Sequence, residues 1–388
     1  MANFDHAASQ LGNALEAHAN PHTSRVLFLY LGRRGLSNFV HGVAAASRAH
    51  PSIDATMAIS RQGDAIAALA SSPSSTLLLN TFEHGHGAAL QSWRLLGLRR
   101  QLLERFNRDH TEAVIDLMPH VWSPFIARTA RNSGVRYVAL VHDARRHPGD
   151  RSGVVRPIAN LAVRQADRVI TMSHAVASQV IAGGLVASDR VVVLFHPDLA
   201  FPASPRDAAH PAPKAPLRLL FLGRILPYKG MALFLDTVDV LRARGIDVAP
   251  GVFGSGSLHH HRKRLTAMGA EVVNRWLSDR EIGEILARHD ALVASHTEAS
   301  QSGTVAAALA SGLPCVVTPV GGLIEQVNDG VTGVVAEAPT ADALASAVIR
   351  LFSHHTYATV SENIAAQQPR RSMTRFVEMC VRATRDTL

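Results

Sequence analysis

Two series of alternating strand-like and helix-like segments, separated by a proline-rich stretch, dominate the sequence. The first series has short aliphatic or β-branched runs, typical of buried parallel strands, at Arg25–Leu31, Ser75–Asn80, Ala113–Leu117, Val135–His142, Arg168–Met172 and Val191–Phe195. Phe201–Pro216 holds five prolines, which remove amide donors and disfavour helix, and is predicted to be a linker. The second series has its runs at Leu217–Leu222, Val248–Phe253, Ala270–Val273, Ala291–Ser295, Pro314–Thr318 and Gly333–Ala336. This pattern predicts an α/β fold with two doubly wound domains facing each other across a cleft, residues 1–200 and 217–368, joined by residues 201–216.

Composition narrows the classes of partner and compartment. The chain has 388 residues and a formal net charge of +8, which favours anionic partners such as phosphates, nucleotides or acidic lipids. Cys315 and Cys380 are its two cysteines, so a disulfide scaffold is excluded. No apolar run reaches the ~18 residues of a membrane-spanning helix, and Met1–Asn20 lacks the pattern of a signal peptide. We therefore expect a cytoplasmic protein. Nucleic-acid binding is excluded because no basic motif with interleaved aromatic residues occurs.

Glycines and charges at strand ends mark the candidate site, because doubly wound sheets bind ligands beyond the carboxyl ends of their strands. Gly32 and Gly35 follow the first strand, but their spacing differs from a dinucleotide fingerprint, so NAD is not expected. Their loop is either a tight turn or an anion- or acceptor-binding loop. Arg224 and Lys229 share the loop after Leu217–Leu222. A guanidinium fork and a mobile ammonium can clamp a diphosphate, although two such residues can also be merely solvated.

A third strand end combines a carboxylate with a helix start. Glu298 stands at the predicted strand tip, and Ser300 to Thr304 open an Ala-rich helix, where backbone amides would meet the positive end of the helix dipole. Carboxylate and amides together could hold sugar hydroxyls and phosphate oxygens. The blander alternative is that Ser300 or Ser302 caps the helix, which is compatible with ligand binding.

In this order the motifs resemble the donor domain of retaining glycosyltransferases of family 4, which have the GT-B architecture. The resemblance spans about Leu217 to Val335 and rests on Gly223-Arg224…Lys229-Gly230, Val252-Phe-Gly-Ser-Gly-Ser, Leu277-Ser-Asp…Glu281-Ile, Glu298…Ala308-Leu-Ala-Ser-Gly-Leu-Pro-Cys-Val-Val-Thr, Gly321-Gly…Glu325 and Asn328-Asp-Gly-Val-Thr-Gly. It implies sugar transfer from a nucleoside-diphosphate donor, without a cofactor or metal ion. It also implies that a C-terminal helix, residues 369–388, crosses back to the N-terminal domain.

The resemblance assigns roles to single residues. Arg224 and Lys229 occupy the positions that bind the donor pyrophosphate and stabilise its departure. Glu298 matches the first Glu of the paired-Glu motif, which contacts the transferred sugar. Where the family places a second Glu on the ribose, this chain has Ala306, which leaves ribose anchoring open. The further donor-binding positions implied by the resemblance are Gly32, Gly35, Gly254, Gly256, Trp276, Ser302, Gly303 and Thr304.

One N-terminal segment, Val141-His-Asp-Ala-Arg-Arg-His-Pro-Gly, is similar to a segment of some family members. His142 follows a strand and is expected to face the cleft near the reacting sugar. Asp143 and His147 crowd the same loop and are candidate acceptor residues. A purely structural role for His142 is the alternative.

Two further patterns have two interpretations each. His259, His260 and His261 are consecutive, and consecutive helical residues point about 100° apart, so a solvated helix start is preferred to a metal site. Gln91–His110, taken as a helix, could rest on an acidic membrane or simply cover the sheet. Its apolar stripe comprises Leu95, Leu96, Leu98, Leu102, Leu103 and Phe106, with Trp93, Arg94, Arg105 and Arg108 opposite.

These observations predict a retaining, metal-independent glycosyltransferase, cytoplasmic and peripheral to the membrane. It would move a sugar onto a glycan or lipid-linked glycan in surface polysaccharide synthesis. Cations and helix amides suit this reaction because negative charge develops on the departing nucleoside diphosphate. Ala306 leaves open a non-catalytic sugar-nucleotide-binding subunit. A sugar-nucleotide epimerase shares the architecture, but its acid–base carboxylates are not recognisable in this sequence.

Overall fold

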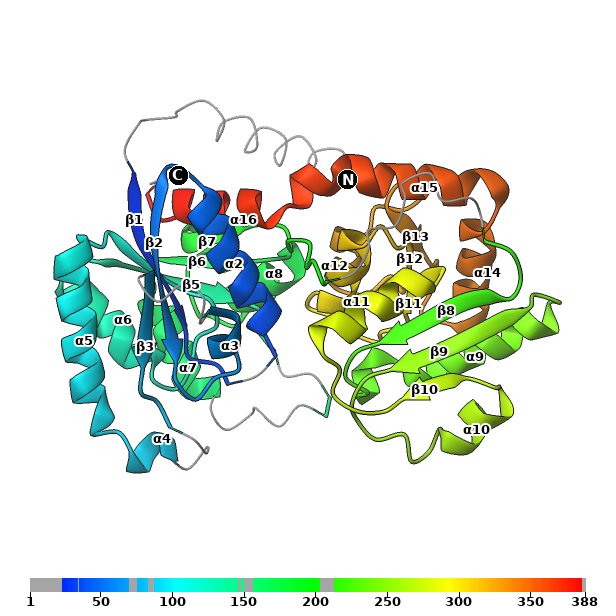
Figure 1. Ribbon diagram of the computed structural model, residues 1–388, viewed down its shortest axis with the longest axis horizontal. Coiled ribbons are helices and arrows are strands. Elements are labelled where there is room, and N and C mark those ends of the chain that lie inside the picture. Colours follow the sequence, from blue (N-terminus) through cyan, green and yellow to red (C-terminus); the bar gives the residue numbers. More distant parts are fainter. Residues whose placement is uncertain are drawn as a thin grey trace.

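A computed structural model describes residues 23–33, 35–69, 75–82, 87–145, 148–149, 156–202 and 213–385. Two parallel sheets organise these residues (Figure 1). Of the predicted linker, residues 203–212 lie outside the described ranges.

The N-terminal sheet has seven parallel strands in the order β3-β2-β1-β4-β5-β6-β7. Their bounds are β1 Ser24–Tyr30, β2 Ile53–Ser60, β3 Thr76–Leu79, β4 Ala113–Asp116, β5 Arg136–Val141, β6 Arg168–Thr171 and β7 Val191–Val193. The sequence analysis missed β2, which pairs with β1 from Ser24↔Ile53 to Tyr30↔Ile59. The chain reverses its direction of growth between β1 and β4, so the carboxyl ends of these two strands flank a topological switch point.

Helices cover both faces of this sheet. The helices are α2 Ser37–Ala49, α3 Ala65–Leu69, α4 Gly87–Leu90, α5 Arg94–Asp109, α6 Ser123–Asn132, α7 Arg156–Gln165 and α8 His174–Ala182. One face packs against α2 and α3, and the other packs against α5, α6, α7 and α8. In α5, Leu98, Leu102 and Phe106 are buried in the second of these cores, as expected of a covering helix, whereas Leu96 is 71% exposed.

The C-terminal sheet has six parallel strands in the order β10-β9-β8-β11-β12-β13. Their bounds are β8 Leu217–Leu222, β9 Val248–Phe253, β10 Glu271–Val273, β11 Ala291–Ala294, β12 Cys315–Val317 and β13 Gly333–Val335. The helices are α9 Met231–Ala243, α10 Arg262–Ala267, α11 Asp279–Arg288, α12 Gly303–Ala310, α13 Leu323–Gln326, α14 Ala341–Leu351, α15 His354–Gln367 and α16 Met373–Arg382. Here the switch point lies between β8 and β11.

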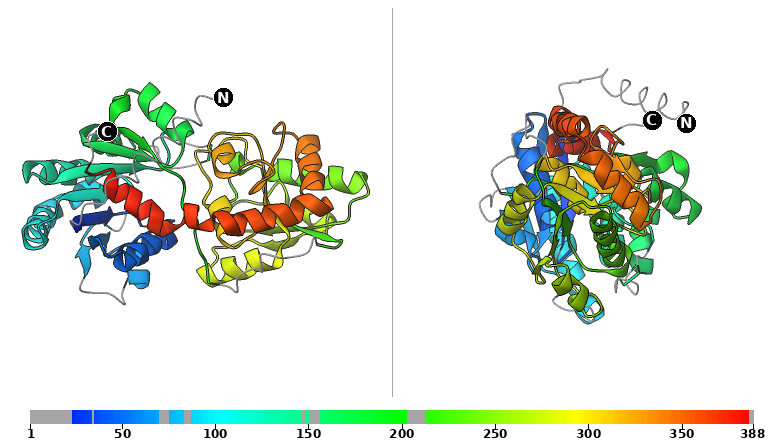
Figure 2. Two further views of the ribbon diagram at one scale, coloured as in Figure 1. Left: turned by 90° about the horizontal axis from the view of Figure 1, so that it is seen from above. Right: turned by 90° about the vertical axis from the view of Figure 1, so that its right-hand side faces the viewer.

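The end of the chain connects the two halves. Figure 2 shows α15 and α16, in orange and red, running along the length of the molecule. Phe376, Val377 and Cys380 of α16 are buried in the core on the α2 side of the N-terminal sheet. At the crossing, Arg371 Nε lies 3.0 Å from Asp198 Oδ1, and the Asp198 amide donates to the Arg371 carbonyl. Both side chains of this ion pair are largely buried.

Candidate active site

Residues 223–230, which we call the β8 loop, lie against the residues that follow β9. The Gly223 amide donates to the Phe253 carbonyl at 2.9 Å. Gly254 has φ +140°, and a Cβ there would lie 1.8 Å from the Gly223 carbonyl oxygen. At Gly256 a Cβ would lie 2.4 Å from the Ile225 oxygen. Glycine at these two positions therefore lets the two loops approach each other and fixes the course of the β8 loop.

The β8 loop holds one buried and one exposed cation. Lys229 is only 9% exposed, and its Nζ lies 2.7 Å from His296 Nε2. Burial, reinforced by the Arg224 guanidinium, lowers the pKa of Lys229 to about 8, and Asp143 of the N-terminal half opposes this shift. The Arg224 side chain is exposed. The electrostatic coupling shows that the two predicted cations occupy one neighbourhood, which Asp143 approaches from the other half.

Residues 295–302, the β11 loop, lie beside the β8 loop because β8 and β11 are neighbouring strands. The Thr297 amide donates to the Tyr228 carbonyl at 2.8 Å, which joins the two loops directly. Glu298 follows with an exposed side chain. Ala306 is buried on α12, and its carbonyl accepts from the Leu199 amide of the segment that leads out of the N-terminal sheet.

The start of α12 differs in part from the prediction. The Ser302 amide donates to Gln326 Oε1 at 2.6 Å, and the Gln326 side-chain nitrogen donates to the Ser302 carbonyl. In this structure the Ser302 amide is therefore occupied by Gln326, and its predicted contact with a donor stays a prediction. The Ser302 hydroxyl does not cap the helix, since it lies 2.9 Å from Thr304 Oγ1. Gly303 and Thr304 supply the first amides of α12, which have no carbonyl one turn earlier within the helix.

Contacts from the N-terminal half reach the β11 loop. Ser173 Oγ donates to the Ser300 carbonyl at 2.8 Å. Glu325 beside it accepts from the amides of His174 at 2.6 Å and Ala175 at 2.9 Å, at the start of α8. A carboxylate at this position is favourable because it meets the positive end of the helix dipole. Sequence reasoning assigned no role to Ser173 or Glu325, because their partners lie more than a hundred residues away.

His142 forms contacts within its own half. Its Nε2 lies 2.8 Å from the Leu117 carbonyl oxygen, and its ring meets the Phe39 ring edge to face at 5.5 Å. Burial lowers the pKa of His142, so the neutral imidazole is favoured. These contacts provide the structural role that the sequence left as an alternative. Asp143 is exposed, and His147 lies outside the described residues.

The first glycine loop is shaped by its neighbours. Gly35 has φ +101°, and its amide lies 3.4 Å from Asp64 Oδ2. A Cβ at Gly32 would lie 2.5 Å from the Tyr30 ring. These contacts account for the tight turn after β1.

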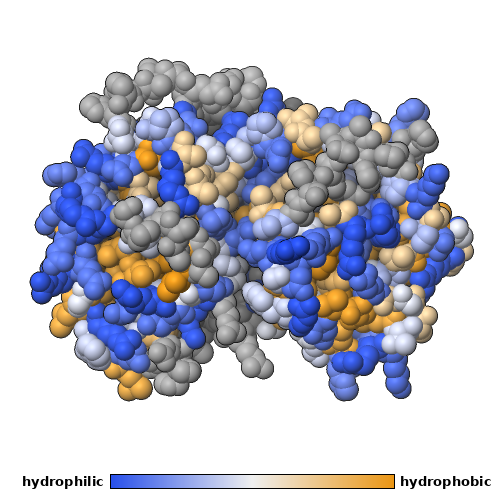
Figure 3. Space-filling model, viewed as in Figure 1, coloured by the Kyte–Doolittle hydropathy of each residue, from blue (hydrophilic) through white to orange (hydrophobic). Residues whose placement is uncertain are grey.

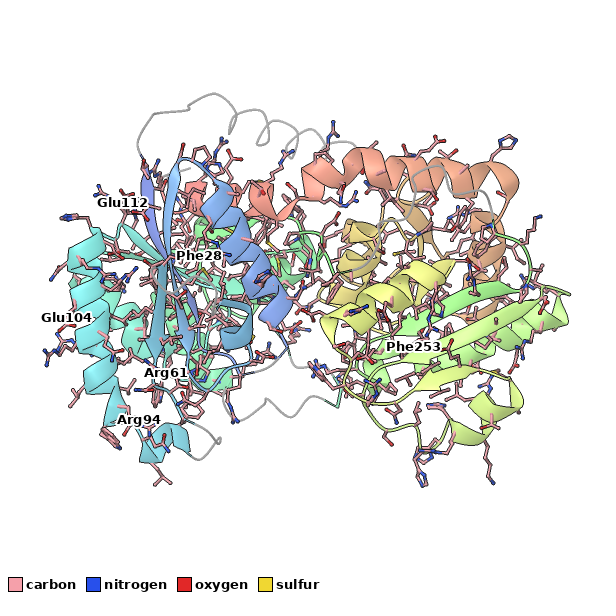
Figure 4. All side chains as sticks on the ribbon, viewed as in Figure 1. Phe28, Arg61, Arg94, Glu104, Glu112 and Phe253 are labelled. Carbon is pink, nitrogen blue, oxygen red and sulfur yellow. The ribbon has the colours of Figure 1, made fainter. Side chains whose placement is uncertain are left out.

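Trp276 is 60% exposed and follows β10. Beside it lies a groove of about 240 Å³ between β10 and α11, lined among others by Phe253, Arg275, Leu277 and Glu281. Figure 4 shows Phe253 at the centre of the C-terminal half. Arg275 and Glu281 form an ion pair at this groove, and that pairing lowers the pKa of Glu281.

The described ranges hold neither a metal-binding cluster nor a membrane-spanning helix. Within them, no three His, Cys, Asp or Glu side chains gather in a way that could hold a metal ion. His259 and His260 are exposed ahead of α10. None of the helices in the described ranges has the length and apolar character needed to cross a bilayer.

Comparisons with known proteins give a family match for part of the chain and a shared fold for nearly all of it. Residues 216–354 match the sequence family described as glycosyl transferases group 1. No curated protein sequence matches the chain. Among solved structures, a glycosyltransferase from Rickettsia africae ESF-5 superposes with a TM-score of 0.67 at 13% identity, covering 94% of this chain and 100% of that one. HepE from Anabaena, solved with UDP-glucose, gives 0.67 at 17% identity over 94% and 100%.

A third structure, sucrose-phosphate synthase from Thermosynechococcus elongatus, superposes with a TM-score of 0.64 at 14% identity, covering 92% and 98% of the two chains. The predicted fold class, two Rossmann-like domains in the GT-B arrangement, is confirmed. The fold is thus that of GT-B glycosyltransferase structures, and residues 216–354 carry the match to glycosyl transferases group 1.

Proposed function

We propose that this protein is a retaining glycosyltransferase of family 4 that transfers a sugar from a nucleoside-diphosphate donor to a glycan or lipid-linked glycan in surface polysaccharide synthesis. The observation that carries the proposal is the neighbourhood of Arg224, Lys229 and the start of α12 at the switch point between β8 and β11. The UDP-glucose bound to HepE supports a UDP-sugar as the first donor to test.

The proposed chemistry follows from where charge develops. Cleavage of the sugar–phosphate bond places negative charge on the leaving nucleoside diphosphate. Arg224, Lys229 and the amides of Gly303 and Thr304 would stabilise that charge without a metal ion or cofactor. Glu298 would hold hydroxyls of the transferred sugar. Acceptor contacts are assigned to the loop that carries Asp143 and His147, and the nucleobase to the surroundings of Trp276.

Release of nucleoside diphosphate from a panel of UDP-, GDP- and ADP-sugars tests the proposal. Arg224→Ala should lower turnover about 10²-fold, the usual effect of removing one transition-state contact. Arg280→Ala is the matched control, because Arg280 is an exposed arginine of the same half that pairs with Glu284 on α11. Wild-type turnover in both Arg224→Ala and Lys229→Ala would refute the assigned roles.

Ala306, which stands where the family has its second Glu, supports a second candidate function, that of a non-catalytic subunit that binds sugar nucleotides. Calorimetric binding of a donor without turnover across a wide acceptor panel would favour that candidate. A new sugar nucleotide formed without any acceptor would instead indicate an epimerase.

We further propose that the protein sits at the cytoplasmic membrane surface through the α4–α5 corner, residues 87–100. Leu90, Trp93 and Leu96 project there with 73%, 68% and 71% of their surface exposed. Arg99 and Arg100 are exposed on the next turn, so a bilayer rich in anionic lipid complements both the apolar and the charged side chains. Apolar surface is visible at this corner in Figure 3, and Arg94 marks it in Figure 4. The stripe formed by Leu98, Leu102 and Phe106 is excluded from this role because it is buried.

Co-sedimentation with vesicles tests the membrane contact. The wild-type protein should bind vesicles of phosphatidylcholine with 30% phosphatidylglycerol, about tenfold better than vesicles of phosphatidylcholine alone. Trp93→Ser with Leu96→Ser should abolish most of this binding, whereas Ile349→Ser, at a 39% exposed position on α14, should not. Equal binding by the double variant and the wild-type protein would contradict the proposal.

A further inference from the structure

His296 lies beside Lys229 at the switch point between β8 and β11, but it has no role in the function proposed above. It follows β11 by two residues and is 3% exposed. Its carbonyl accepts a hydrogen bond from Thr318 Oγ1 at 2.6 Å, which fixes the backbone. Its ring packs edge to face against Tyr228, with centroids 6.2 Å apart. The backbone hydrogen bond and the ring contact with Tyr228 together restrict the orientation of the imidazole.

The imidazole is directed at Lys229. Nε2 of His296 lies 2.7 Å from Lys229 Nζ, a hydrogen-bond distance between two nitrogens. The hydrogen-bond contact of this ammonium is with the imidazole, and Asp143 adds an electrostatic attraction. A buried cation needs an acceptor, and here the imidazole Nε2 is placed to accept from the ammonium. A carboxylate in its place would cancel the charge, whereas an imidazole orients the ammonium and leaves its positive charge available to an anionic ligand.

The same ring nitrogen connects Lys229 to the start of α12. Ser302 Oγ lies 3.4 Å from His296 Nε2 and 2.9 Å from Thr304 Oγ1. The ammonium, the imidazole and two hydroxyls thus form one cluster beside the first amides of α12. A shift of the imidazole would move Nζ relative to those amides.

We propose that His296 is a positioning residue: it holds the Lys229 ammonium, charged and aimed at the diphosphate of the donor, before the donor arrives. The inference rests on the proposed function, since it assumes that Lys229 meets a nucleoside diphosphate. It predicts that His296 acts through a single accepted hydrogen bond.

The proposed role of His296 also affects the pKa of Lys229. Burial and the Arg224 guanidinium lower the pKa of Lys229 to about 8, and Asp143 acts in the opposite direction. Tyr228 also faces the ammonium, with its ring centroid 5.3 Å from Nζ. A hydrogen bond accepted from the charged form favours that form, so loss of the His296 acceptor should lower the pKa of Lys229 further.

The chain is suited to a direct test because it has only three lysines, Lys214, Lys229 and Lys263. Selective ¹³C labelling of lysine should give three Cε signals, and Lys229→Arg identifies one of them by its loss. In the full-length protein without donor, His296→Leu should shift the titration of the Lys229 signal down by about one pH unit, the effect of losing one hydrogen bond to a charged group. His296→Gln, which retains an acceptor, should restore most of the shift.

Binding of UDP, GDP and ADP, measured by calorimetry at pH 7.5, provides the functional readout. For the nucleotide that the wild-type protein binds, His296→Leu should weaken binding about tenfold, and His296→Gln should recover to within about threefold. His289→Leu is the control, because His289 is 4% exposed, bonds to the Ile285 carbonyl and precedes β11 at its opposite end. It should change thermal stability without changing the Lys229 titration.

Two outcomes would overturn the proposal. The first is an unchanged Lys229 titration in His296→Leu. The second is equal impairment of the Leu and Gln variants, which would indicate a packing role only. The proposed function fails separately, when the wild-type protein binds none of the three nucleotides or when Arg224→Ala binds them as tightly as wild type. The lysine titration in the donor-free protein reports on His296 in either case.

Discussion

The close approach of the β8 loop and the residues after β9 predicts a large effect of Gly254→Ala. A Cβ at this position would lie 1.8 Å from the Gly223 carbonyl oxygen, and the residue has φ +140°. The added methyl group cannot be accommodated by a side-chain rotation, because the atom that it meets belongs to the backbone. Either Gly254 changes its conformation or the β8 loop moves away.

The cost can be estimated from the contacts that would be lost. A backbone conformation reserved for glycine costs a residue with a side chain about 1–3 kcal/mol. Separation of the loops would also break the bonds from Gly223 N–H to Phe253 O and from Ile225 N–H to Ser255 O. At about 1 kcal/mol each, these bring the total to about 4 kcal/mol, a large share of the stability of a typical domain.

Gly245→Ala separates the two contributions. Gly245 has φ +77°, but nothing lies within 4 Å of the Cβ that would be added, so only backbone strain of about 1–2 kcal/mol is expected. Urea denaturation followed by far-UV circular dichroism measures both variants against wild type. Gly254→Ala should also weaken nucleotide binding, because the β8 loop carries Arg224 and Lys229. Equal midpoints for the two alanine variants would refute the close-approach argument.

Three further predictions concern charge and burial. Glu325→Gln removes a charge from the contact with α8, so it should lower the melting temperature slightly and raise the radius of gyration in solution scattering. Unchanged values of both would contradict the inference that this contact holds the two halves together. Burial raises the pKa of Asp116 to about 6, above that of an unfolded Asp, so its contribution to stability is present at low pH and lost as the pH rises from about 4 to 6. The unfolding free energy of Asp116→Asn relative to wild type should therefore rise over that range by on the order of 3 kcal/mol. A difference between the two proteins that does not change with pH would contradict this prediction. Asp198→Ala should cost about 3–5 kcal/mol because it leaves Arg371 buried without its partner, and adding Arg371→Met should recover much of this loss in thermal denaturation.

Sequence reasoning located most strands because buried parallel strands are continuous apolar runs. It missed β2, whose sequence Ile-Asp-Ala-Thr-Met-Ala-Ile-Ser interrupts such a run with Asp54 and Thr56. That segment is a strand because β1 and β3 pair with it on either side. Pairing of this kind joins residues distant in sequence, so a local pattern does not reveal it.

The residues of the candidate site could be predicted from the sequence, but several of their contacts could not. The positions of Arg224, Lys229 and Glu298 at strand ends could be predicted from the sequence, because strand ends are local features. The use of the Ser302 amide by Gln326 could not be, and neither could the His296 contact with Lys229, because both depend on how separate loops meet.

The sequence alone determined the two α/β halves, the strand ends that carry charge and the absence of Glu at position 306, because periodicity and residue type are properties of neighbouring residues. The tertiary structure alone decided that Lys229 is buried against the His296 imidazole, that Glu325 accepts hydrogen bonds from the start of α8 in the other half, and that Leu98, Leu102 and Phe106 of α5 face inward while Leu96 is exposed. Hydrogen bonds and burial depend on which distant segments share a volume, and only the packed chain fixes that.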